Sequence, residues 1–125
     1  MITSIYAALL GLLLVGLSVY VIHWRRTLAV GLGEGEDKNL QLAIRAHGNF
    51  IEYVPLALII IALAELGGAS PLAIHGLGAS LVMARIAHAI GMARSSGSNP
   101  GRALGVVLTF IVLLAGSGLL LAGAW

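Results

Sequence analysis

The sequence contains no cysteine and very little charge. Its 125 residues include 7 Lys or Arg and 5 Asp or Glu. The absence of cysteine excludes disulfides, thiolate nucleophiles of the protein itself and cysteine-ligated metals. Only 10% of the residues are charged and 59% are hydrophobic, whereas a soluble domain of this length needs a larger polar fraction to cover its surface. The net charge of only +2 gives no indication of nucleic-acid binding.

Long hydrophobic runs dominate the chain instead. Residues 2–22 and 103–125 carry no charge, and at about 1.5 Å per residue each can cross about 30 Å of hydrocarbon. The first run lacks the positive start of a signal peptide, so we expect a retained span. Residues 47–66 and 71–93 are long enough to span but include polar side chains. We predict a single domain over residues 1–125, an all-α integral membrane protein built as a four-helix up-down bundle.

The positive charges predict the orientation of this bundle. They lie in or beside the first and third connections, whereas the turn between the second and third spans has none. The residues concerned are Arg25, Arg26, Lys38, Arg94 and Arg102. Because positive loops face the cytoplasm, we expect both termini outside and the first and third connections inside.

Polar residues in the second and third spans form the most informative pattern. Residues three or four apart share a helix face, and this spacing predicts one polar stripe on the second helix. The stripe consists of Lys38, Gln41, Arg45, Asn49 and Glu52. Counted from the turn of the hairpin, Glu52 lies at the depth of Arg85 and Asn49 at the depth of His88.

The charged residues Glu52 and Arg85 need partners inside the membrane, because an unpaired charge there is energetically costly. A charge at the centre of a membrane helix costs roughly 2.5–3.5 kcal/mol on insertion scales. One interpretation is a purely structural ion pair between Glu52 and Arg85. A second is a binding site for an anion, which the excess of cationic groups favours. No histidine and carboxylate set shows metal-ligand spacing, so we expect no metal site.

The second-span segment Arg45-Ala-His-Gly-Asn-Phe-Ile-Glu-Tyr-Val-Pro55 resembles the MAPEG family, membrane-associated proteins in eicosanoid and glutathione metabolism. The segment Arg85-Ile-Ala-His88 is similar to the family's second pattern, and Arg102 to a third, weaker position. The resemblance implies a homotrimer that binds glutathione as co-substrate between subunits, on the cytoplasmic side. It implies a bacterial-type member, related to microsomal glutathione transferases, in the inner membrane.

The resemblance also implies residue roles. The glutathione-binding residues would be Arg45, Asn49, Glu52, Arg85 and His88. Arg102 would be the catalytic residue, holding the thiol of glutathione as thiolate. Arg25 or Arg26 would reach the site from the first helix, and the residues do not decide which. The second substrate would be an apolar electrophile or lipid that arrives through the bilayer.

The sequence departs from the prostaglandin and leukotriene synthases of that family. Gly48 replaces an arginine of some members, and Met92 and Val106 replace tyrosines that contact the peptide. These departures argue against an eicosanoid substrate. The leading hypothesis is therefore a glutathione transferase or peroxidase, and the alternative is a non-catalytic lipid- or protein-binding member. A small four-helix transporter is disfavoured, because small multidrug exporters carry a carboxylate in the first span and this first span has none.

Overall fold

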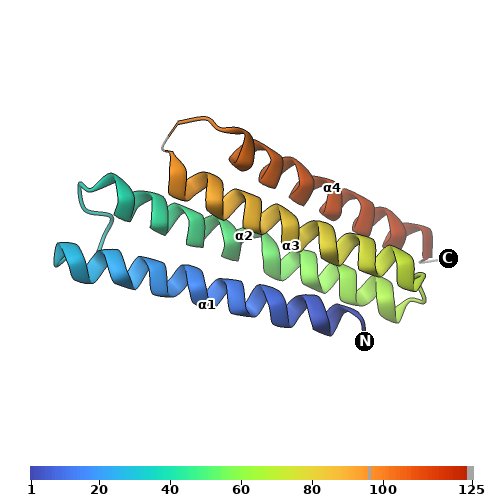
Figure 1. The fold of residues 1–125 in the computed structure, drawn as a ribbon. Coiled ribbons are helices and arrows are strands. Elements are labelled where there is room, and N and C mark those ends of the chain that lie inside the picture. Colours follow the sequence, from blue (N-terminus) through green and yellow to red (C-terminus); the bar gives the residue numbers. More distant parts are fainter. Residues whose placement is uncertain (96, 124–125) are drawn as a thin grey trace.

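Four long helices make up the protein in a computed structural model that describes residues 1–95 and 97–123. They are α1 (Thr3–Leu28), α2 (Lys38–Leu66), α3 (Pro71–Arg94) and α4 (Pro100–Gly123). Each is long and apolar enough to cross a membrane. The helices run alternately up and down, and the α1–α2 and α3–α4 connections lie at the same end (Figure 1). The predicted all-α, four-helix membrane fold is confirmed.

α2 extends well ahead of its predicted span, and a side chain caps its first turn. α2 begins at Lys38, nine residues ahead of the predicted span, where the Asp37 carboxylate accepts the N–H groups of Asn39 at 2.8 Å and Leu40 at 3.2 Å. α3 begins as predicted, with Ser70 as cap and Pro71 in its first turn. The last two residues of the predicted fourth span, 124 and 125, lie outside the described residues.

α2 and α3 form the centre of the molecule. Each contacts the other and both outer helices, whereas α1 and α4 make no contact with each other over the residues that the structure describes. The buried positions of α2 recur every three or four residues, as expected for a helix with one face toward the core. They are Leu40, Ala43, Ala46, Phe50, Val54, Ala57, Ile61 and Ala64.

α3 and α4 approach closely because glycines lie between them. A Cβ atom added at Gly105 would lie 2.6 Å from the Cβ of His88 and 2.7 Å from the carbonyl oxygen of Ala84. A Cβ added at Gly91 would lie 2.6 Å from the backbone nitrogen of Arg102. Small residues thus bring the first turns of α4 against the last turns of α3.

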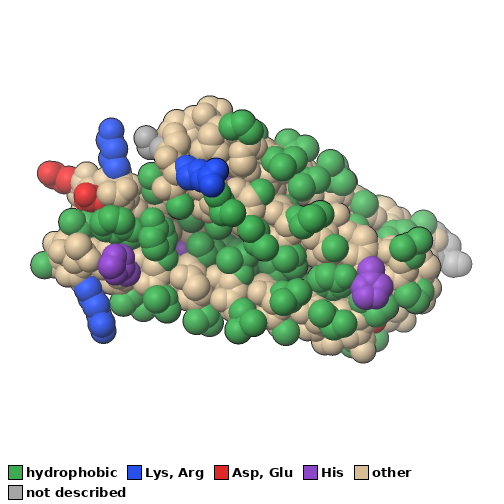
Figure 2. Space-filling model, in the orientation of Figure 1, with side chains coloured by type: hydrophobic (Ala, Val, Ile, Leu, Met, Phe, Trp, Pro, Cys, Tyr) green, Lys and Arg blue, Asp and Glu red, His purple; other side chains and the backbone are tan. Residues whose placement is uncertain are grey.

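Most of the charged side chains visible on one face gather at the end that carries the α1–α2 and α3–α4 connections, while hydrophobic side chains cover the length of the helices (Figure 2). The opposite end has its own polar contacts. The Glu65 carboxylate accepts the backbone N–H of Ile2, the N–H of Thr3 at 2.8 Å and the Thr3 hydroxyl at 2.6 Å. The Tyr6 hydroxyl and His75 Nδ1 are hydrogen-bonded at 2.8 Å. These contacts join α1 to α2 and α3, far along the bundle from the charged end.

Candidate functional site

Arg85 lies in the core, between α2, α3 and α4. Its side chain is 2% exposed, and its two terminal nitrogens donate to Asn49 Oδ1 at 2.8 Å and to the carbonyl oxygen of Gly105 at 3.1 Å. Its Nε is buried without a hydrogen-bond partner among the described residues. Because Asn49 uses its oxygen to accept from Arg85, its amide nitrogen remains available as a donor. Arg85 therefore orients Asn49 and anchors it to α4 through Gly105.

Glu52 does not contact Arg85, contrary to the expected pair. Over the described residues the two side chains form no ion pair, and Glu52 is exposed on the surface of the chain. The reason is rotation about the axis of α2. Glu52 lies two residues from Phe50 and two from Val54, both buried, so it points about 200° away from the core. The residue count predicted the depth of Glu52 along the hairpin, but it could not predict the rotation of Glu52 about the axis of α2.

A first groove lies beside α4, where Arg102, Asn49 and His88 meet. Its volume is about 570 Å³, and its wall is completed by the α3–α4 connection and by apolar residues of α4. His88 is 6% exposed and has no hydrogen-bond partner among the described residues. Asn49 and His88 thus share a layer, as the hairpin count predicts, and both offer polar atoms to this groove.

A second groove, of about 300 Å³, lies on the other side of Arg102. It is lined by the start of the polar stripe and by two residues from α3 and α4. The lining residues are Lys38, Gln41, Leu42, Arg45, Met92 and Arg102. Arg45 is exposed and has no hydrogen-bond partner among the described residues. The groove therefore presents three cationic side chains and no carboxylate.

Arg102 connects the two grooves, because it lines both. It lies in the first turn of α4, and one of its terminal nitrogens donates to the carbonyl oxygen of Gly97 at 2.8 Å. A cation is unfavourable at a helix N-terminus, where the helix dipole is already positive. Guanidinium and dipole together make this position attractive to an anion.

Two predicted residues of the first helix differ in their surroundings. Arg25 donates to the carbonyl oxygen of Val30 at 3.3 Å, just beyond the end of its own helix, whereas Arg26 is exposed. Neither lines one of the two grooves. The structure groups no three His, Cys, Asp or Glu side chains as a metal site in the part of the chain that it describes.

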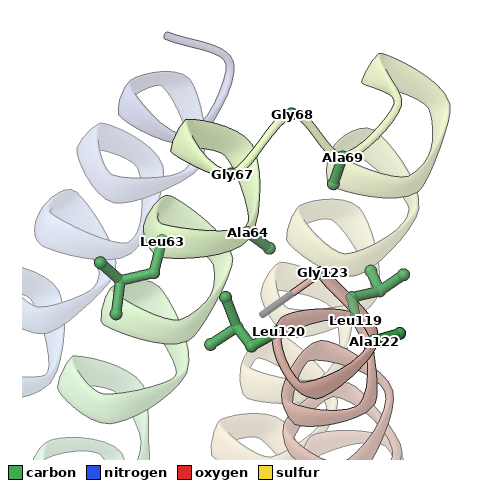
Figure 3. Close-up of a pocket in the computed structure, with 9 residues that line it drawn as sticks. All are labelled: Leu63, Ala64, Gly67, Gly68, Ala69, Leu119, Leu120, Ala122 and Gly123. Atoms are coloured by element: carbon green, nitrogen blue, oxygen red, sulfur yellow. The ribbon is translucent and has the colours of Figure 1, made fainter. Parts of the chain in front are cut away.

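A further cavity is of a different kind. It has a volume of about 590 Å³ and lies at the opposite end, between the α2–α3 turn and the last turn of α4 (Figure 3). The described residues that line it are nine Leu, Ala and Gly residues, and none of these nine has a titratable side chain. This cavity is similar in volume to the first groove, but the charged side chains line the two grooves at Arg102.

Comparison with known proteins identifies the family of this chain. The model of the MAPEG family matches residues 3–122, which is almost the whole chain. This chain belongs to the MAPEG family. It is also similar to the inner membrane protein YecN of Escherichia coli, in strain K12 and in strain O6:H1, each with 37% identity over 91 residues. The match covers 73% of this chain and 70% of YecN.

The two residues that we expect to replace tyrosines of the eicosanoid synthases both line the grooves. Met92 lines the groove that holds Arg45, and Val106 lines the groove that holds His88. Each flanks Arg102 with an apolar side chain that offers no hydroxyl donor. The polar side chains that line the two grooves are those of Lys38, Gln41, Arg45, Asn49, His88, Ser98, Asn99 and Arg102.

Neither Asn99 nor the backbone of Gly105 was predicted to belong to the site. Asn99 lines the first groove and hydrogen-bonds both α3 and α4, and the carbonyl of Gly105 holds Arg85. A signal for Asn99 was present: an Asn before Pro at the start of a helical segment is a typical N-cap. Nothing in the sequence marks one backbone carbonyl as the partner of an arginine.

Proposed function

We propose that this protein binds glutathione at the two grooves around Arg102 and uses it as a transferase or peroxidase toward apolar electrophiles. One observation carries the proposal: Arg102 is shared by a groove containing Arg45 and a groove containing Asn49 and His88. A peptide with two carboxylates and a thiol needs several separated donors, and guanidinium groups suit carboxylates. Membership of the MAPEG family supports this choice of ligand.

The chemistry assigned to the site needs no general base from the protein. Arg102 and the N-terminal turn of α4 would lower the pKa of the bound thiol, so that its proton passes to water. The thiolate sulfur then forms a bond to the electrophilic carbon, and the leaving group departs with the bonding electrons. The second substrate would reach the sulfur from the hydrocarbon along the apolar side of α4, past Val106.

The proposal includes a homotrimer with the site between neighbouring subunits. Glu52 is exposed near the middle of α2, and every seventh residue along that face is exposed as well. This face is marked by Arg45, Glu52, Ile59 and Leu66. Another copy of the chain is the natural cover for a carboxylate at this depth, since hydrocarbon is a poor one. Glu52 would then meet the ammonium group of glutathione from across the subunit boundary.

The proposed location is the inner membrane, where YecN resides by its name. We propose that both termini lie outside and that the grooves face the cytoplasm, because the positive residues gather at that end of the bundle.

Glutathione binding and turnover test the function directly. The purified trimer in detergent is titrated with glutathione by calorimetry and assayed for conjugation of a chlorodinitrobenzene. We expect binding at millimolar glutathione or below, and an ultraviolet thiolate band of the bound peptide. Arg102→Ala is expected to remove the band and at least tenfold of the rate, whereas Arg94→Ala, an exposed arginine outside both grooves, leaves them unchanged. A folded trimer that does not bind glutathione at millimolar concentration contradicts the proposal.

A second candidate is a non-catalytic binding protein. Met92 and Val106 favour it, because both grooves lack the tyrosine donors of the synthases. Glutathione bound without turnover, or a lipid that co-purifies with the trimer in stoichiometric amount, would decide for this function.

A further inference from the structure

Asn99 is the only side chain shown to hydrogen-bond both α3 and α4 within the described part of the α3–α4 connection. Its Nδ2 donates to the carbonyl oxygen of Gly91 at 2.8 Å, and its Oδ1 accepts the backbone N–H of Arg102 at 3.0 Å. Its own carbonyl accepts the N–H of Ala103 at 3.2 Å. One amide therefore satisfies a carbonyl in the last turn of α3 and an N–H in the first turn of α4, both of which the helices leave unpaired.

The space for this amide exists because residue 91 is glycine. A Cβ at Gly91 would lie 2.7 Å from Asn99 Oδ1 and 2.6 Å from the Arg102 nitrogen. His88 lies one turn before Gly91 on α3, and its Cβ packs against Gly105 of α4. The Gly91–Asn99–Arg102 contact thus fixes Arg102 opposite His88, across the groove of about 570 Å³ that both line.

We propose that Asn99 is the positioning residue for Arg102: its bridge to Gly91 sets the place of the Arg102 guanidinium relative to His88. This inference rests on the proposed function for its catalytic consequence, but not for its structural one. An N-cap alone would need only the oxygen of Asn99. The bond from Nδ2 to Gly91 is what distinguishes positioning from capping.

Two substitutions separate these roles. Asn99→Ser keeps an oxygen that caps α4 but cannot reach Gly91, and Asn99→Ala loses both bonds. Positioning predicts that both variants lose the thiolate band of bound glutathione and about fivefold to tenfold in kcat, while Asn99→Ser, which loses only the bond to Gly91, melts at a temperature between those of Asn99→Ala and the parent. Capping alone predicts that Asn99→Ser behaves as the parent. A thiolate band and kcat unchanged in Asn99→Ser therefore overturn the proposal.

A measurement without glutathione keeps the test independent of the proposed function. Because the chain has no cysteine, single cysteines at the exposed positions Ile90 of α3 and Leu104 of α4 can carry spin labels without a background. We expect a narrow distance distribution between the labels in the parent and a broader one in Asn99→Ser. If the parent neither binds nor activates glutathione, the proposed function fails. The distribution of label distances then tests by itself whether Asn99 holds α4 in place against α3. A distribution as narrow in Asn99→Ser as in the parent overturns it.

Discussion

At the scale of the residue, Arg85 shows how a buried cation is held without a carboxylate. Its two hydrogen bonds, to Asn49 and Gly105, use the fork of the guanidinium, which a lysine cannot reproduce. We expect Arg85→Lys to lower the free energy of unfolding by about 1.5–3 kcal/mol, as for loss of a hydrogen bond to a charged group. Thermal unfolding in detergent measures this. Arg26→Lys, at an exposed arginine, is the control and should unfold with the parent.

The residue scale is also where prediction from sequence was most uneven. The count along the hairpin put Asn49 and His88 in one layer, and they do line one groove. The same count paired Glu52 with Arg85, which is wrong for the single chain, because Phe50 and Val54 turn Glu52 away from the core. The pairing of Arg85 with Asn49 could not be predicted, since a long flexible side chain chooses among partners by rotamers that the sequence does not specify.

At the scale of the element, the clearest predictions concern stability at the ends of the helices. α1 ends at Leu28 and is followed by Ala29, which has the left-handed φ of 54° that glycine adopts freely. The N–H groups of Ala29 and Val30 donate to the carbonyl oxygens of Arg26 and Arg25 in the last turn of α1. These two hydrogen bonds require the left-handed conformation at Ala29. We expect Ala29→Gly to stabilise the protein by about 1 kcal/mol, because the Cβ penalty disappears. The same change at Ala8, exposed inside α1, should destabilise it by about 1 kcal/mol. Equal shifts of the melting temperature for both variants would refute this explanation.

The start of α1 depends on another helix. The Glu65 carboxylate of α2 accepts two backbone N–H groups and the Thr3 hydroxyl, while Ile2 at the N-cap offers no side-chain oxygen. Glu65→Gln leaves one acceptor oxygen and places an amide N–H group beside the N–H and O–H donors of Ile2 and Thr3. We therefore expect the free energy of unfolding, measured by thermal unfolding, to fall by about 1–3 kcal/mol. Glu36→Gln, in the exposed α1–α2 connection, should have no effect. An unchanged melting temperature for Glu65→Gln would show that the contact contributes nothing.

The helices themselves were predictable, and this long-range cap was not. Hydrophobic run length set the number and order of the helices, because only spans of about twenty residues satisfy a bilayer. Local cap signals such as Asp37 and Ser70 could set the starts of α2 and α3. Glu65 and Thr3 lie 62 residues apart, and no local pattern brings them together.

At the scale of the whole molecule, the exposed Glu52 decides whether the single chain is the functional unit. If Glu52 faced hydrocarbon, neutralising it would remove a cost of roughly 2.5–3.5 kcal/mol, and Glu52→Gln would be more stable than the parent. If Glu52 faces another copy of the chain and pairs with a cation there, the same substitution weakens the assembly. The two arrangements therefore predict effects of opposite sign.

We expect the second sign, with Glu52→Gln shifting the protein from trimer toward monomer at low protein concentration in detergent. Light scattering coupled to size-exclusion chromatography measures the mass, and Glu34→Gln, in the exposed α1–α2 connection, is the matched control. Weaker assembly in Glu52→Gln should also affect the groove of Arg45 and Arg102. Arg45 lies on the same face of α2, seven residues before Glu52, so separating the copies would remove one wall from the groove of Arg45 and Arg102. Glutathione affinity should then fall together with the trimer fraction. A Glu52→Gln variant that stays trimeric and melts at a higher temperature than the parent would place this carboxylate in lipid.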